Sequence, residues 1–239
     1  MNTRMFLMVA SLCLMFQVLI APTAWGQAAA DQKRMTALER EVASLKLQVT
    51  ALEDRLEALL GPESGKKTVD VPVGNSPVRG PATAPLTLVM FGDYQSDATV
   101  RASSSVARLL TTYSTQLRLV YKQFPLTQKH PMASDAALAA LAALRQNRFW
   151  EMHEQLMVNS RRLDAATLIS LAEQVGLDVR RFENDRRALA TLELLDQDEK
   201  LAEKVEVSGV PTLFLNGRIL ESWRYDYLKS EVEKALGKK

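Results

Sequence analysis

The clearest periodic pattern in the chain lies between residues 31 and 60, where apolar residues recur at alternating spacings of three and four. They are Met35, Leu38, Val42, Leu45, Val49, Leu52, Leu56 and Leu59. A stripe this narrow is typical of a coiled-coil seam, because a helix packed on a globular core needs a wider apolar arc. The pattern predicts a coiled-coil stalk that self-associates, and a helix packed on its own domain is the alternative.

The heptad positions also bear on how such a stalk would assemble. Leu stands at every d position and Val at two of the four a positions, which favours two parallel strands and leaves a trimer open. Arg34 with Glu39, and Glu41 with Lys46, are complementary g-to-e pairs across a parallel partner. At 1.5 Å per residue, the stalk would be about 45 Å long.

The segment before the stalk has the pattern of an export signal. Arg4 is followed by an uncharged apolar run that reaches Ile20, and small residues at Ala24 and Gly26 precede Gln27. This order predicts a secretory signal peptide over residues 1–26 and an exported protein. The run is borderline in length for crossing a bilayer, so an uncleaved membrane anchor is the alternative.

After a Gly- and Lys-containing linker at residues 61–68, the pattern changes to that of an α/β domain over residues 69–239. Residues 69–73 read as a short edge strand and 74–85 as a surface loop with Gly and Pro. Residues 86–91 read as a strand buried on both faces, 100–112 as a helix and 117–124 as a second strand. Strand, helix and strand together predict a parallel βαβ unit.

The rest of the domain reads as helices followed by a hairpin. Residues 131–204 are almost entirely helical in pattern, with Asp164 and Asp178 at positions that cap helices. Pro211 then opens a strand that ends in Asn216-Gly217, a strong hairpin signal, and residues 225–236 form a closing helix.

Two short stretches carry a family resemblance. The first contains Phe91 and Asp93, and the second contains Gly209, Pro211, Thr212, Asn216 and Gly217. Together they resemble the DsbA-like disulfide oxidoreductases of bacterial envelopes, which read F-x-D-x-x-C-P-x-C and G-[TV]-P-T-x-x-x-N-G at these places. The resemblance implies an α/β thioredoxin-like fold with a helical insertion at about residues 131–204, and a periplasmic location.

The chain departs from that family at the redox centre. Ser96 and Thr99 stand where the two cysteines belong, and Asp97 stands where the proline belongs. The one cysteine of the chain is Cys13, inside the predicted signal peptide. Because a serine hydroxyl forms no reversible sulfur–sulfur bond, thiol–disulfide exchange is not expected of this domain.

What the resemblance leaves is a binding groove. In the family, the proline matching Pro211 is cis and the residue matching Val210 pairs through its backbone with an extended peptide. Ser96, Asp97, Val210 and Pro211 are therefore the expected substrate-binding residues, and the expected partners are extended peptides or secreted proteins. The alternative is that Pro211 only maintains the fold. A third possibility is that the stalk is the working part and the domain a cap.

Other chemistries find less support. Kappa-class glutathione transferases share this fold and use a serine at the first cysteine position, so a glutathione-dependent activity through Ser96 is an alternative, although the charge of Asp97 opposes a nearby thiolate. A Ser-His hydrolase is less favoured still, because Ser96 does not lie in a G-x-S-x-G elbow and the sequence places neither histidine beside it. His153-Glu154 begins like a zinc-protease helix, but Met157 replaces the second histidine. A net charge of +2 gives no indication of nucleic acid. We expect no cofactor and no metal.

Overall fold

The structure is a computed structural model, and it describes residues 31–52, 55 and 68–238. The predicted signal peptide at 1–26 and all of the predicted linker except Thr68 lie outside the described residues. The chain divides into two units, one ending at Gly65 and the other beginning at Lys66.

The first unit contains a helix over residues 31–52. Six predicted seam residues lie on it with 49–64% of their surface exposed in the single chain: Met35, Leu38, Val42, Leu45, Val49 and Leu52. The remaining seam positions, Leu56 and Leu59, lie outside the described residues. Within residues 31–52, this unit is thus a helix with an exposed apolar stripe.

The second unit is built on a five-stranded sheet in the order β1-β3-β2-β4-β5. The strands are β1 (Val78–Arg79), β2 (Leu86–Gly92), β3 (Leu117–Gln123), β4 (Thr212–Leu215) and β5 (Arg218–Ile219). β2 pairs with β3 in parallel, as the predicted βαβ unit requires, and the other neighbours pair antiparallel.

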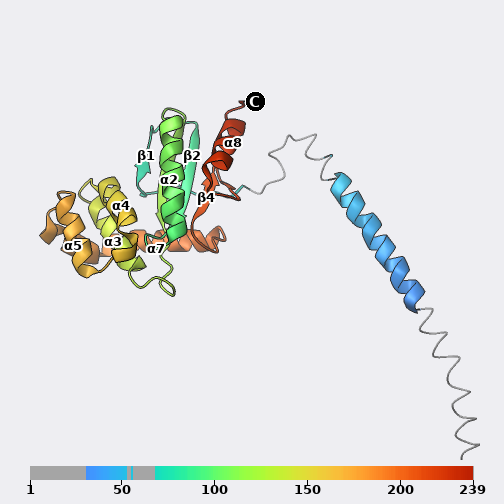
Figure 1. Ribbon diagram of the computed structural model, residues 1–239, viewed down its shortest axis with the longest axis horizontal. Coiled ribbons are helices and arrows are strands. Elements are labelled where there is room, and N and C mark those ends of the chain that lie inside the picture. The colour runs from blue at the N-terminus through green and yellow to red at the C-terminus, as the bar shows by residue number, and fades with distance from the viewer. Residues whose placement is uncertain (1–30, 53–54, 56–67, 239) are drawn as a thin grey trace, which may run out of the picture. The chain divides into compact units, whose positions relative to one another are not determined.

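Helices cover the sheet and form the predicted insertion. They are α2 (Asp97–Thr112), α3 (Ala133–Leu144), α4 (Phe149–Val158), the 3-10 turn η1 (Ser160–Arg162), α5 (Ala165–Gln174), α6 (Val179–Arg187), α7 (Leu189–Lys204) and α8 (Tyr225–Ala235). Figure 1 shows α2 and α8 lying together over the strands, with α3, α4 and α5 gathered beside them.

The central strand β2 explains this layering. Leu88 and Met90 belong to a core that includes α2 and α8, whereas Val89 and Phe91 pack with Ala202 and other residues near the end of α7. Since alternate residues of a strand point to opposite faces, a run that is apolar at nearly every position must be covered on both sides. The run therefore fixes β2 in the middle of this unit.

Three predicted boundaries were wrong. Residues 69–73 form no strand, because Pro72 lacks a backbone donor. The segment is joined to β5's hairpin by the bond from Val69 N to Gly217 O (2.9 Å), and an isolated bridge at Thr68 precedes it. The predicted loop 74–85 contains β1, which pairs with β3. Helix α2 begins at Asp97, three residues earlier than predicted.

The predicted hairpin is present, and its turn has the expected backbone. Asn216 and Gly217 have φ values of 47° and 82°, which a two-residue turn of this kind requires. Asp164 and Asp178 cap α5 and α6 by accepting hydrogen bonds from Thr167 N (2.7 Å) and Arg181 N (2.9 Å). Within residues 31–52 and 68–238, no helix is long and apolar enough to cross a membrane.

Candidate functional site

The loop between β2 and α2 is organised by Asp93 rather than by the residues at the former cysteine positions. One carboxylate oxygen of Asp93 accepts from Gln95 N (2.8 Å), and the other accepts from Leu126 N (2.8 Å) and contacts His130 Nδ1 (2.7 Å). The side chain of Asp93 is fully buried. A buried carboxylate needs several partners, and here they tie the end of β2 to the segment that follows β3.

Ser96 and Thr99 have structural roles at the start of α2. Ser96 is the N-cap, and its Oγ accepts from Thr99 N at 3.3 Å. Thr99 is fully buried, and its Oγ1 accepts from Asp93 N at 3.4 Å. A side chain at Gly92 would overlap both Thr99 and the Tyr121 hydroxyl, so the glycine permits this close approach. Serine is among the best N-cap residues, because its hydroxyl oxygen can accept from an N–H group of the first helical turn that has no partner within the helix, here that of Thr99.

Asp97 projects from the first turn of α2 and pairs with Arg161 of η1. Two hydrogen bonds join them, from Arg161 Nε (3.1 Å) and Nη2 (2.9 Å). The hydrogen bond and charge of Arg161 lower the pKa of the Asp97 carboxyl below its usual value. The site therefore presents an ionised carboxylate and a guanidinium side by side at a helix N-terminus, both accessible to solvent.

The second half of the predicted groove precedes β4. The peptide bond between Val210 and Pro211 is cis. Thr212 Oγ1 donates to Gly209 O at 2.7 Å across this turn. In the described part of the chain, the backbone N–H and C=O of Val210 have no hydrogen-bond partner, although the residue is only half exposed. An unpaired backbone donor and acceptor at such a position are free to bond an added strand.

The sheet register brings the two halves to one edge. Phe91, near the end of β2, pairs with Thr212, the first residue of β4, so the loop carrying Ser96 and the turn at Val210-Pro211 leave the same end of the sheet. Among the described residues, no hydrogen bond or ion pair joins one half to the other. Arg161 was missed by sequence reasoning, because it lies 64 residues from Asp97 and no local pattern marks it.

Each histidine forms a hydrogen bond with a residue other than Ser96. His130 pairs with Asp93, and His153 lies in a buried aromatic cluster where its Nδ1 shares a hydrogen bond with the Tyr94 hydroxyl (3.1 Å). The rings of Tyr121, Phe149 and Trp150 surround it at 4.6–5.7 Å. Burial, with a smaller effect of the Arg79 charge, lowers the pKa of His153 to about 3, so this imidazole is neutral at physiological pH.

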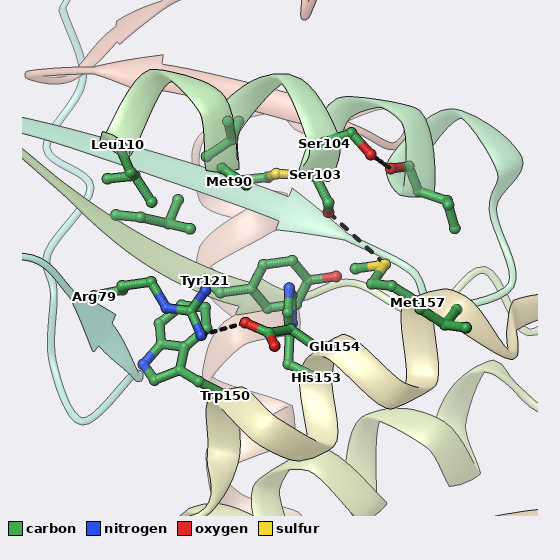
Figure 2. A pocket seen from close by; sticks show the side chains of 15 residues that line it. Arg79, Met90, Ser103, Ser104, Leu110, Tyr121, Trp150, His153, Glu154 and Met157 are labelled. Atoms are coloured by element: carbon green, nitrogen blue, oxygen red, sulfur yellow. Dashed lines mark hydrogen bonds and ion pairs between the residues drawn. The ribbon is translucent and has the colours of Figure 1, made fainter. Parts of the chain in front are cut away.

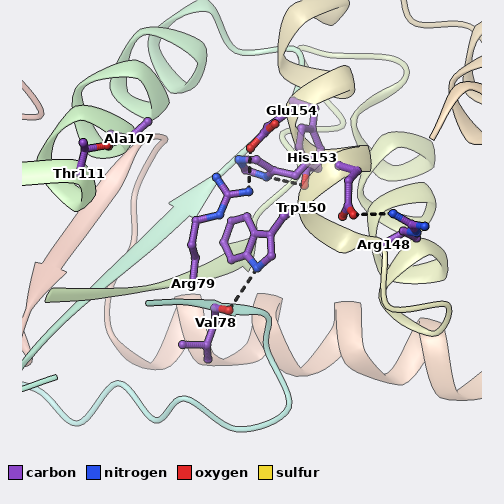
Figure 3. A network of polar contacts seen from close by, with 10 residues as sticks. Val78, Arg79, Ala107, Thr111, Arg148, Trp150, His153 and Glu154 are labelled. Atoms are coloured by element: carbon purple, nitrogen blue, oxygen red, sulfur yellow. Dashed lines mark hydrogen bonds and ion pairs between the residues drawn. The ribbon is translucent and has the colours of Figure 1, made fainter. Parts of the chain in front are cut away.

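A separate cavity of about 370 Å³ lies between α2, α4 and the sheet (Figure 2). Arg79 and Glu154 pair at its edge (2.7 Å), and the Arg79 guanidinium stacks on Trp150 at 4.4 Å. Figure 3 shows how this group is anchored: the Trp150 indole donates to Val78 O (3.1 Å), which fixes the ring beneath Arg79. Sequence reasoning missed this cavity, because it is assembled from five elements.

The chemistry of the predicted groove follows from these contacts. Ser96 has no hydrogen bond to either histidine, so the described residues contain no Ser-His pair there. In residues 31–52 and 68–238 no cluster of three or more His, Cys, Asp or Glu side chains suits a metal ion. The two predicted halves of the groove present an unpaired backbone N–H and C=O at Val210, and the carboxylate of Asp97 beside the guanidinium of Arg161; binding by these groups stays a prediction.

Similar proteins place this architecture in a known group. Residues 87–233, more than half of the chain, match the DSBA-like thioredoxin domain. A thioredoxin-like oxidoreductase from Silicibacter pomeroyi aligns with a TM-score of 0.63 and 28% identity over 70% of this chain and 95% of that one. A linker-deletion mutant of ScsC from Proteus mirabilis aligns with a TM-score of 0.59 and 21% identity over 99% and 97%.

A curated relative is 41% identical over 169 residues, which are 69% of this chain and 25% of that protein: the Na(+)/H(+) antiporter NhaA 3 of Salinispora tropica. The chain thus spans about a quarter of the length of this relative. The match to the DSBA-like domain confirms the predicted fold class, an α/β thioredoxin-like fold with a helical insertion. This protein belongs to the family of DSBA-like thioredoxin domains.

Proposed function

We propose that this protein is a redox-inactive member of its family that binds extended segments of other proteins in the bacterial envelope. The observation that carries the proposal is Val210, whose backbone N–H and C=O are unpaired beside the cis bond to Pro211. Strand addition at such an edge gives affinity through the main chain and needs no cysteine. The client is therefore a peptide in extended conformation.

The former redox centre supports binding rather than exchange. With Ser96 capping α2 and Thr99 buried, neither side chain offers a thiol or a free nucleophile. Asp97 and Arg161 present both charges at the rim, where they would select among peptides by their charged side chains. A glutathione-dependent activity through Ser96 is less favoured, because its oxygen already serves the helix and the ionised Asp97 would repel a thiolate.

Self-association through residues 31–60 forms the second part of the proposal. The exposed apolar stripe of helix 31–52 is regular, and a stripe of this kind is stable in water when another helix covers it. The occupant we propose is the same helix of a second copy. Two or more grooves on one stalk would raise the avidity for a client that carries several extended segments, without any change at a single site.

A photocrosslinking experiment tests the groove. A photoreactive residue placed at position 97 of the full chain in cells should capture other envelope proteins, whereas the same residue at Arg180 on α6, or at Arg40 on the stalk helix, should not. Both control positions are exposed. Capture at 97 that is no greater than at the two controls would contradict peptide binding and leave the stalk as the working element.

A further inference from the structure

We infer that the cavity between α2, α4 and the sheet is a binding site for a small monocarboxylate with an apolar body of about ten carbon atoms. None of the four predicted groove residues lines this cavity, so the site is distinct from the proposed peptide groove. Apolar cavities of a few hundred Å³ with a small number of polar groups are the usual form of small-molecule sites.

The walls of the cavity set the size and polarity of the occupant. Strands β2 and β3 contribute Met90, Leu119 and Tyr121, α2 contributes Val106 and Leu110, and α4 contributes Met157. At about 30 Å³ for each water-sized group, a volume near 370 Å³ accommodates roughly twelve non-hydrogen atoms. The surface of the cavity is mostly apolar. The Tyr121 hydroxyl is a buried polar atom of its lining, without a hydrogen-bond partner in the described part of the chain. The body of the ligand is therefore apolar.

The edge of the cavity sets the charge of the ligand. Arg79 is held over the Trp150 ring, and its side chain is only 37% exposed, so the guanidinium is already ordered before a ligand arrives. A guanidinium has a planar fork of donors that matches a carboxylate. Figure 2 shows Arg79, Trp150 and Glu154 grouped beside the cavity-lining side chains. A carboxylate at this edge would receive hydrogen bonds while its apolar body fills the cavity.

Glu154 is the internal competitor for Arg79. Its side chain is 59% exposed, and an ion pair so open to water contributes little, so Glu154 is easily released to solvent. A cationic ligand is disfavoured, because the face of Trp150 that would attract it is already covered by Arg79. The ligand carboxylate would thus replace the carboxylate of Glu154 on an arginine that does not move.

Two probes that share one apolar body test the inference. Calorimetric titration of the full chain at pH 7.5 should show 4-phenylbutyrate binding at least tenfold more tightly than the uncharged 4-phenylbutan-1-ol. Arg79→Gln should remove this preference, Glu154→Gln should tighten the acid severalfold, and Arg180→Gln on the exposed surface of α6 should change nothing. No binding of the acid, equal binding of acid and alcohol, or an acid preference that survives Arg79→Gln would each overturn the inference.

A second variant tests the place of binding without disturbing the ion pair. Ala107 lies on the exposed side of α2 and lines the cavity mouth, so Ala107→Trp should close the mouth while the helix stays folded. We expect at least tenfold weaker binding of 4-phenylbutyrate with an unchanged thermal midpoint in the absence of ligand. Undiminished binding by the folded variant would overturn the assignment to this cavity.

Discussion

The residues at the former cysteine positions stabilise a helix instead of activating a nucleophile. A thiolate at a helix N-terminus is stabilised by the same free N–H groups and dipole that a cap uses. Here Ser96 accepts from Thr99 N, and the carboxylate of Asp97 follows in the first turn of α2. Both are favourable at a helix start, so the local electrostatics that would lower a cysteine pKa now contribute to folding stability.

His153 gives the first prediction, also at the scale of one side chain. Its pKa is about 3 in the folded protein and near 6.5 in the unfolded chain, so only the unfolded state binds the proton between these values. The contribution of His153 to the free energy of unfolding therefore falls as the pH falls below 6.5, by about 1.4 kcal/mol between pH 7.5 and pH 5.5. Urea denaturation at the two pH values measures it.

The matched variant for this measurement is His153→Phe, which keeps an aromatic ring in the cluster and removes the titrating group. Its free energy of unfolding should change with pH by about 1.4 kcal/mol less than that of the parent chain over the same interval. The contributions of all other groups are common to the two proteins and cancel in the comparison. Equal pH dependence of the two proteins would show that His153 is not held neutral.

At the scale of the elements, the sequence predicted those helices and strands that have long apolar patterns. β2, β3 and α8 were found because each has several consecutive residues with one periodicity. β1 was missed because it has two residues, Val78 and Arg79, between Pro77 and Gly80, and its pairing with β3 is a tertiary contact. The start of α2 was placed three residues late because the cap is polar and carries no periodic signal.

The residues of the candidate sites also differ in whether a local sequence pattern marks them. Ser96 and Pro211 could be proposed as site residues because each lies in a short family motif, which is a local property of the sequence, and peptide binding by them stays a prediction. Arg161 and the group at Arg79 and Trp150 were not found, since each depends on segments brought together by folding. Arg79 and Trp150 are 71 positions apart in the sequence, and only the packing of β1 beside α4 stacks one on the other.

The stalk helix provides a prediction with an internal control. Leu45 and Leu47 lie on the same helix and are both exposed in the single chain, at 53% and 73%, but only Leu45 lies on the heptad stripe. Leu45→Asp places a charge in the proposed seam and should convert the proposed oligomer to a monomer at micromolar concentration. Leu47→Asp should leave the oligomer intact. Sedimentation velocity distinguishes these results, and equal behaviour of the two variants would contradict a coiled coil in this register.

At the scale of the whole domain, one buried ion pair joins the sheet to the helical insertion. Lys122 on β3 and Asp198 on α7 lie 3.1 Å apart, and each side chain is 5–6% exposed. Lys122 also donates to Val73 O (3.3 Å), and Asp198 accepts from Gln123 N (2.9 Å) and Ser76 Oγ (3.3 Å). The pair therefore fixes three segments that are distant in the sequence.

Replacing only Lys122 should lower the free energy of unfolding more than replacing both members of the ion pair. Lys122→Met leaves the Asp198 carboxyl buried without its counter-charge, and burial already raises the pKa of that carboxyl. We expect the free energy of unfolding at pH 7 to fall by about 3 kcal/mol, as measured by urea denaturation.

The double variant Lys122→Met with Asp198→Asn separates charge from packing. Asn keeps an acceptor for Gln123 N and removes the buried charge, so the double variant should be more stable than Lys122→Met alone. Such non-additivity is the mark of two residues that act on each other directly. If the losses of Lys122→Met and of Asp198→Asn, each measured alone, simply add in the double variant, the sheet and the insertion are held together by packing, and the ion pair serves only to satisfy its own charges.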